Sequence, residues 1–137
     1  VEVFAALRRA GYAVYLPTLA ADSPCDAVID DGVRLQRVQI KTGYAHASGS
    51  IRWRTCTTSF HRRGGGMRSY RGVADLFAVW VPELARCYLV PVDECGSWGS
   101  ALRLAPPRNN QRKKIRLAAD YELRPLPPRP RHVREPD

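Results

Sequence analysis

The spacing of hydrophobic residues changes along the chain and predicts one helix followed by strands. Val3, Leu7 and Ala10 recur at helical spacing, which predicts a short helix over residues 2–10 that ends at Gly11. Beyond it, short apolar runs bounded by Gly, Pro, Asp and Ser are typical of strands joined by turns. The expected strands cover residues 12–17, 26–29, 33–42, 50–56, 75–81, 87–92 and 102–104, and a short helix is expected near residues 118–121. This order predicts an α/β fold with an N-terminal helix, a mixed β-sheet and flanking helices.

The Asp-Gly pair at residues 31–32 is a strong signal for a hairpin between two of these strands. If these two residues form the turn, Asp26 lies opposite Arg37 on the neighbouring strand. A four-residue loop over residues 30–33 gives the same alternation of faces. The hairpin therefore predicts which side chains share one face of the sheet.

One face of this hairpin is polar and the other is apolar. Because side chains alternate along a strand, Gln39 and Lys41 join Asp26 on one face, whereas Val38 and Ile40 point into the core. A carboxylate, an amide and an amine thus gather over an apolar layer.

This arrangement is compatible with hydrolysis at phosphorus. A carboxylate such as Asp26 suits Mg²⁺, and the Ile40 carbonyl at the strand edge is a plausible second oxygen ligand. Lys41 is placed to position or deprotonate a water that attacks phosphorus. The alternative is structural: an ion pair between Asp26 and Arg37 across the hairpin, with Lys41 only solvated.

The charge of the chain points to a polyanionic partner. The 137 residues include 22 basic and 13 acidic ones, a net charge of +9. We find no basic amphipathic helix for a membrane surface and no apolar run near the roughly 18 residues that span a bilayer. No Walker A motif is present, because no glycine precedes Lys41-Thr42, so no nucleotide cofactor is expected. Nucleic acid is the favoured partner.

Arginine supplies most of the positive charge, in clusters that are candidates for contacts to DNA phosphates. Nineteen of the 22 cations are arginines, and Lys41 is the only lysine within an apolar segment. Two arginines share a strand face, four lie in the glycine-rich segment 61–72, and two lysines lie in a second basic run. The candidate DNA-binding residues are Arg52, Arg54, Arg62, Arg63, Arg68, Arg71, Lys113 and Lys114.

The cysteines and the C-terminal segment complete the organisation. The four cysteines form no CxxC or zinc-like spacing, so we expect reduced thiols acting as small apolar residues in a cytoplasmic protein. Residues 124–137 contain five prolines and four arginines, which predicts a disordered tail after a single domain over residues 1–123.

Several segments, in this order, resemble a known family. Pro24-Cys-Asp26, a hairpin and then Gln39-Ile-Lys41 resemble the signature of the PD-(D/E)XK nucleases, with glutamine in the usually acidic place. The particular resemblance is to the bacterial homing endonucleases associated with group I introns, in which glutamine at this place is the pattern. It extends over residues 2–123, through the segments 33–43, 50–55, 70–79, 88–92, 102–104, 109–111 and 120–123.

The resemblance implies a restriction-endonuclease-like core and a Mg²⁺-dependent endonuclease that hydrolyses double-stranded DNA, with Mn²⁺ able to substitute. It implies Asp26 as metal ligand, Lys41 as catalytic lysine, Gln39 at the variable catalytic position, and Glu2 as a helix acid assisting the metal. It also implies a homo-oligomer near the nucleoid of a bacterium. Two alternatives remain: a DNA-binding domain without cleavage activity, and a junction resolvase on the same fold.

Overall fold

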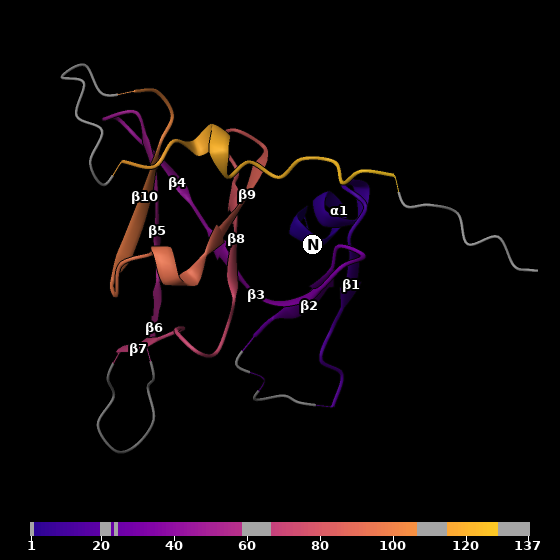
Figure 1. Ribbon diagram of the computed structural model, residues 1–137. Helices are drawn as coiled ribbons and strands as arrows, with labels where there is room; N and C mark the ends of the chain where they lie inside the picture. Colours follow the sequence, from indigo (N-terminus) through magenta and orange to yellow (C-terminus); the bar gives the residue numbers. More distant parts are fainter. Residues whose placement is uncertain (1, 20–22, 24, 59–66, 107–114, 129–137) are drawn as a thin grey trace, which may run out of the picture.

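The N-terminal helix forms as the apolar spacing predicts. The computed structural model describes residues 2–19, 23, 25–58, 67–106 and 115–128 of the chain (Figure 1). Helix α1 covers Glu2–Arg9, and its buried residues Val3 and Leu7 face the sheet. The helix ends because Gly11 adopts a φ of 102°, a left-handed conformation that glycine tolerates at helix ends.

A five-stranded mixed sheet forms the centre of the fold and confirms the predicted α/β class. Its strands lie in the order β1-β2-β3-β8-β9, and only the β3–β8 pair is parallel. The apolar run near residues 75–81 becomes an interior strand, as its near-continuous hydrophobicity predicts. The strands are β1 (Ala13–Tyr15), β2 (Ala27–Asp30), β3 (Leu35–Thr42), β8 (Leu76–Val81) and β9 (Arg86–Pro91).

The predicted register of the β2–β3 hairpin is wrong by two residues, although the predicted faces are right. Val28, and not Asp26, lies opposite Arg37, and a four-residue loop over residues 31–34 joins the strands. The reason lies in side chains that stabilise the longer loop. Oδ1 of Asp31 accepts the N–H groups of Val33 and Arg34 at 2.8 and 2.9 Å.

These backbone donors also lower the pKa of the Asp31 carboxyl, chiefly through the Arg34 N–H. Asp30 caps the same loop, since its Oδ1 accepts the Gly32 N–H at 2.7 Å. The loop is thus held by two carboxylates, which a turn signal from two residues does not reveal. Because the shift is by two residues, every side chain keeps its predicted face.

Beyond β3 the chain enters a second, three-stranded sheet that the sequence pattern did not predict as separate. Its order is β10-β5-β4, and a two-stranded ribbon of β6 and β7 lies at one end. Gly43 stands at the crossing between the two sheets, where an added Cβ would lie 2.7 Å from Cγ1 of Val79. Only glycine fits this approach without displacing the core. The strands are β4 (Tyr44–His46), β5 (Ser50–Arg54), β6 (Cys56–Thr58), β7 (Met67–Ser69) and β10 (Gly99–Arg103).

Two hydrophobic clusters lie on opposite faces of the five-stranded sheet. One contains α1 together with residues such as Ile29 and Val38. The other joins Phe77 and Tyr88 of the large sheet to Ile51 of the small one. Figure 1 accordingly shows α1 and the β10-β5-β4 sheet on opposite sides of β3 and β8. Two 3₁₀ helices, Val92–Glu94 and Ala118–Asp120, complete the described elements.

The cysteines behave as small apolar residues, as expected. All four are reduced thiols; Cys56, Cys87 and Cys95 are buried, and Cys25 is half-buried. Burial raises the pKa of the Cys87 thiol to about 12, which keeps it protonated and unreactive near neutral pH. Among the described helices, none is long and apolar enough to cross a membrane.

The C-terminal segment is described as far as residue 128. The Leu126 N–H donates to the carbonyl of Ala10 at 2.7 Å, so this part of the segment lies against the end of α1. Residues 129–137 of the predicted tail lie outside the described residues.

Candidate active site

Asp26 is fixed against the edge of β3 at the point where its pairing with β2 ends. The Asp26 N–H donates to the Val38 carbonyl at 2.9 Å, and Oδ2 of Asp26 accepts the Ile40 N–H at 2.8 Å. In a strand, the N–H and C=O of one residue point to the same side. The Ile40 carbonyl therefore points toward the side on which Asp26 lies. The exposed carboxylate thus stands beside a backbone carbonyl, as the sequence predicted.

Gln39 and Lys41 lie on the other face of β3 from Val38, which is fully buried. The last pair of the β2–β3 register is Ala27 opposite Val38, so the next pair in the same register is Asp26 opposite Gln39. Side chains two positions apart on a strand are separated by roughly 7 Å. Asp26, Gln39 and Lys41 therefore share one small region on the face that the sequence predicted.

Lys41 is half-buried and held by an aromatic ring. Its Nζ donates to Oη of Tyr70 at 3.3 Å and lies 4.5 Å from the centroid of the Tyr70 ring. Together these distances place the ammonium beside the hydroxyl oxygen, away from the centre of the ring. Lys41 is therefore not simply solvated.

Arg37 does not pair with Asp26, so the structural alternative considered from the sequence is wrong. The Arg37 guanidinium binds Asp75, with Nε–Oδ2 and Nη2–Oδ1 distances of 3.2 Å each. The Arg37 N–H also donates to Oδ2 of Asp75 at 2.7 Å. The Arg37 guanidinium and N–H together lower the pKa of the Asp75 carboxyl. With Arg37 engaged elsewhere, the Asp26 carboxylate keeps its negative charge available to a cation.

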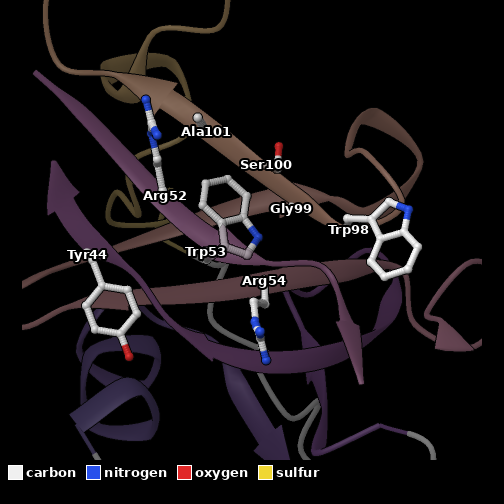
Figure 2. Close-up of a pocket in the computed structure, with 8 residues that line it drawn as sticks. All are labelled: Tyr44, Arg52, Trp53, Arg54, Trp98, Gly99, Ser100 and Ala101. Carbon is white, nitrogen blue, oxygen red and sulfur yellow. The ribbon is translucent and has the colours of Figure 1, made fainter. Parts of the chain in front are cut away.

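A second candidate region is the outward face of β5. Ile51 and Trp53 point inward, whereas Arg52 and Arg54 are exposed, as the alternation predicts. They line an open pocket of about 790 Å³ together with the exposed rings of Tyr44 and Trp98. In the view of Figure 2, the rings of Tyr44 and Trp98 lie at opposite sides of the pocket, with Arg54 between them and Arg52 above Tyr44.

This pocket has the charge expected of a surface that binds a polyanion. Strands β4, β5 and β10 contain no Asp or Glu in their sequences. On the neighbouring strand β10, Gly99 lies opposite Arg54 and Ala101 lies opposite Arg52, so small residues flank both arginines. A flat polyanionic surface can approach the arginines closely there.

The described contacts do not bring the remaining predicted residues to either of these two candidate regions. The exposed Glu2 side chain makes no hydrogen bond or ion pair within the described ranges. Nη2 of Arg71 donates to the Cys95 carbonyl at 3.0 Å. For Arg68, only its place on β7 is described. Arg62, Arg63, Lys113 and Lys114 lie outside the described residues.

Comparison with known proteins identifies the family. Residues 1–124 match the family model described as PD-(D/E)XK endonuclease. The chain belongs to the PD-(D/E)XK endonuclease family. A solved structure, described as the bacterial homing endonuclease I-Ssp6803I, matches with a TM-score of 0.62 and 29% sequence identity. The match covers 88% of this chain and 83% of that one. A search of curated proteins gave no match.

These findings confirm the resemblance and the restriction-endonuclease-like fold inferred from the sequence. Two residues that support the candidate site of this PD-(D/E)XK endonuclease, Asp75 and Tyr70, were not among the site residues predicted from the sequence. The available signal was their nearness to the apolar run 76–81, because residues that enter an interior strand lie close to its neighbours.

Proposed function

We propose that this PD-(D/E)XK endonuclease hydrolyses phosphodiester bonds of double-stranded DNA in the manner of a homing endonuclease, with Mg²⁺ held at Asp26. The observation that carries the proposal is the fixed placement of Asp26 on the Ile40 N–H, on the same strand that presents Lys41. The family and the homing endonuclease neighbour support the nuclease class.

The donor set of the site fits a hard divalent cation. Asp26 uses Oδ2 for the Ile40 N–H, which leaves lone pairs on Oδ1, and the Ile40 carbonyl adds an oxygen. No cluster of three or more His, Cys, Asp or Glu side chains occurs within the described residues. Few protein ligands suit Mg²⁺, which usually keeps several waters, and Mn²⁺ would accept the same oxygens. Glu2 remains the helix acid that the family resemblance implies.

Each side chain of the site has a chemical task in this proposal. When bound, Mg²⁺ lowers the pKa of a coordinated water and neutralises charge that develops on the phosphate. Asp26 supplies negative charge for the cation, and Lys41 orients the attacking water and donates hydrogen bonds to the phosphate oxygens. Gln39 adds an amide without a second negative charge, which favours a single weakly bound cation over two.

DNA affinity comes in this proposal from the arginine face. Arg52 and Arg54 contact phosphates, and the other candidate phosphate contacts are Arg62, Arg63, Arg68, Arg71, Lys113 and Lys114. A chain of this size covers little duplex, so we expect a homo-oligomer to read a long site. The expected place of action is the bacterial cytoplasm, at the nucleoid.

The test is cleavage of supercoiled plasmid and random-sequence linear DNA at low salt, with Mg²⁺, with Mn²⁺ or with EDTA. We expect wild-type cleavage with either metal, none with EDTA, and loss of cleavage in Lys41→Ala with DNA binding retained. The matched control is Arg8→Ala, which removes one positive charge from the exposed face of α1.

Two outcomes would replace the proposal. Strong DNA binding without cleavage of any substrate under all metal conditions would favour the inactive DNA-binding domain. Cleavage confined to four-way junctions, with linear duplex untouched, would favour the junction resolvase.

A further inference from the structure

Tyr70 forms a rigid platform next to Lys41. The residue is only 9% exposed, and its ring meets Phe77 edge to face, with centroids 5.7 Å apart and planes at 88°. Phe77 itself is fully buried and lies opposite Gln39 in the β3–β8 register. An edge-to-face pair on a buried ring fixes the orientation of both rings.

The backbone of Tyr70 is held as firmly as its ring. The Tyr70 carbonyl accepts the N–H groups of Val73 and Ala74 at 3.0 Å each, which closes a tight turn. Nη1 of Arg37 donates to the Gly72 carbonyl within this turn at 3.2 Å. This hydrogen bond ties the turn to β3 at Arg37, four residues before Lys41. Strand β3 therefore positions both Lys41, which it contains, and the turn that carries Tyr70. Their contact follows from the packing of the core.

The two contacts to Lys41 act together on one atom. The Tyr70 hydroxyl accepts a hydrogen bond from Nζ, and the negative face of the ring attracts a cation. Within the described ranges, no carboxylate forms an ion pair with Lys41. The ring thus attracts the ammonium without neutralising it, which leaves its charge for an anionic substrate.

We propose that Tyr70 is a positioning residue that holds Lys41 as a charged hydrogen-bond donor directed at the scissile phosphate. The proposal rests on the proposed function and deepens it. It assigns Lys41 to charge stabilisation and orientation, because the hydroxyl and the aromatic face of Tyr70 both attract an ammonium group.

The geometry can be tested without activity, because the chain has only three lysines, at positions 41, 113 and 114. NMR of protein with isotope-labelled lysine gives three sets of side-chain signals, and Lys41→Ala assigns the one of interest. We expect the Lys41 ε-CH₂ protons to be shifted upfield by the ring current of Tyr70. The shift should persist in Tyr70→Phe and disappear in Tyr70→Leu.

The catalytic part is tested by single-turnover cleavage at saturating DNA. We expect Tyr70→Phe, which keeps the ring and loses the hydroxyl, to slow cleavage about 5-fold. Tyr70→Leu should slow it about 50-fold, since it loses both contacts, while the DNA dissociation constant stays within about twofold of wild type. Tyr121→Phe is the matched control, because its hydroxyl donates to Oε1 of Glu94 at 2.9 Å, away from Lys41.

The outcomes separate this proposal from the proposed function. An unshifted Lys41 signal in the wild-type chain would overturn the positioning role, and so would wild-type cleavage rates in Tyr70→Leu. A shifted Lys41 signal in a chain that cuts no DNA would support the contact and overturn the proposed activity. Melting temperatures show whether Tyr70→Leu remains folded, and Tyr70→Phe keeps the test valid where it does not.

Discussion

The two candidate regions of the molecule differ in how firmly their polar side chains are held. On the five-stranded sheet, Asp26 is bonded to the Ile40 N–H and Lys41 is held against Tyr70. On the three-stranded sheet, Arg52 and Arg54 project from β5 and are exposed, and Arg52 makes one long hydrogen bond, from Nε to Oγ of Ser50 at 3.3 Å. One region carries few charges in fixed positions, and the other carries exposed charges beside small residues.

This difference matches the two tasks of a nuclease. Bond cleavage needs groups placed to a fraction of an ångström, because only interactions that are strong in the transition state accelerate a reaction. Contacts to phosphates along a duplex tolerate side-chain motion, since the attraction is long in range and nonspecific in geometry. The fixed region should therefore govern the rate of cleavage, and the exposed region should govern affinity for DNA.

The largest expected effect separates rate from affinity at Asp26. In Asp26→Asn the amide oxygen can still accept the Ile40 N–H, but the negative charge for the cation is lost. We expect cleavage of bound DNA to fall at least about 10³-fold, or about 4 kcal/mol, with DNA affinity unchanged. Single-turnover kinetics and DNA binding measured without divalent metal check both parts.

The control for this variant is Asp30→Asn at the other end of β2, where the carboxylate caps the loop over residues 31–34. It removes the same charge from the loop end of β2 and should leave cleavage near the wild-type rate. Equal losses in both variants would show that only the overall charge matters, and the comparison between the two regions would then fail.

The next effect concerns the exposed region. Replacing Arg52 and Arg54 together by alanine should weaken DNA binding about 10- to 100-fold at moderate salt. The slope of log affinity against log salt should decrease by about 2, because each lost phosphate contact releases about 0.9 fewer counterions. Cleavage of saturated DNA should stay at the wild-type rate. Titrations at several salt concentrations provide the measurement.

The matched control removes Arg8 and Arg9, two exposed arginines on α1, which lies on the other side of the five-stranded sheet. The double alanine variant has the same net charge as the β5 variant. If it weakens binding as much, affinity depends on total charge, and β5 is not a specific DNA surface.

The smallest effect concerns the ion pair that keeps Arg37 away from Asp26. In Asp75→Asn we expect the melting temperature at pH 7 to fall by about 2–4 °C, because both partners are partly exposed and the pair is screened. The difference in melting temperature between the wild-type chain and Asp75→Asn depends on pH. Arg37 lowers the pKa of Asp75 in the folded chain, so the carboxylate stabilises the fold above the unfolded pKa of about 3.9.

As the pH falls through the lower folded pKa of Asp75, this stabilisation is lost, and the two proteins should then melt alike. Thermal melts between pH 7 and pH 2 test the sign. Glu122→Gln, which removes a looser pair with Arg86 at 3.5 Å, should change the melting temperature less. A difference that grows toward low pH would show that Asp75 acts in another way.

The sequence by itself determined the local features of this protein. Apolar spacing predicted α1, and alternation along residues 33–42 placed Asp26, Gln39 and Lys41 on one face and Val38 in the core. These features follow from backbone geometry, since the side-chain period of a helix or strand is the same wherever the element packs. The order of the motifs along the chain also indicated the PD-(D/E)XK family.

Tertiary structure decided which residues meet. Asp75 lies 38 positions from Arg37, and Tyr70 lies 29 positions from Lys41, so their contacts exist only because β3 and β8 pair in parallel. The hairpin register also depended on loop carboxylates, and not on the Asp-Gly signal alone. Periodicity determines the face of a strand on which a side chain lies. Its partner depends on which distant strand packs beside it, and that packing is determined by burial of the whole core.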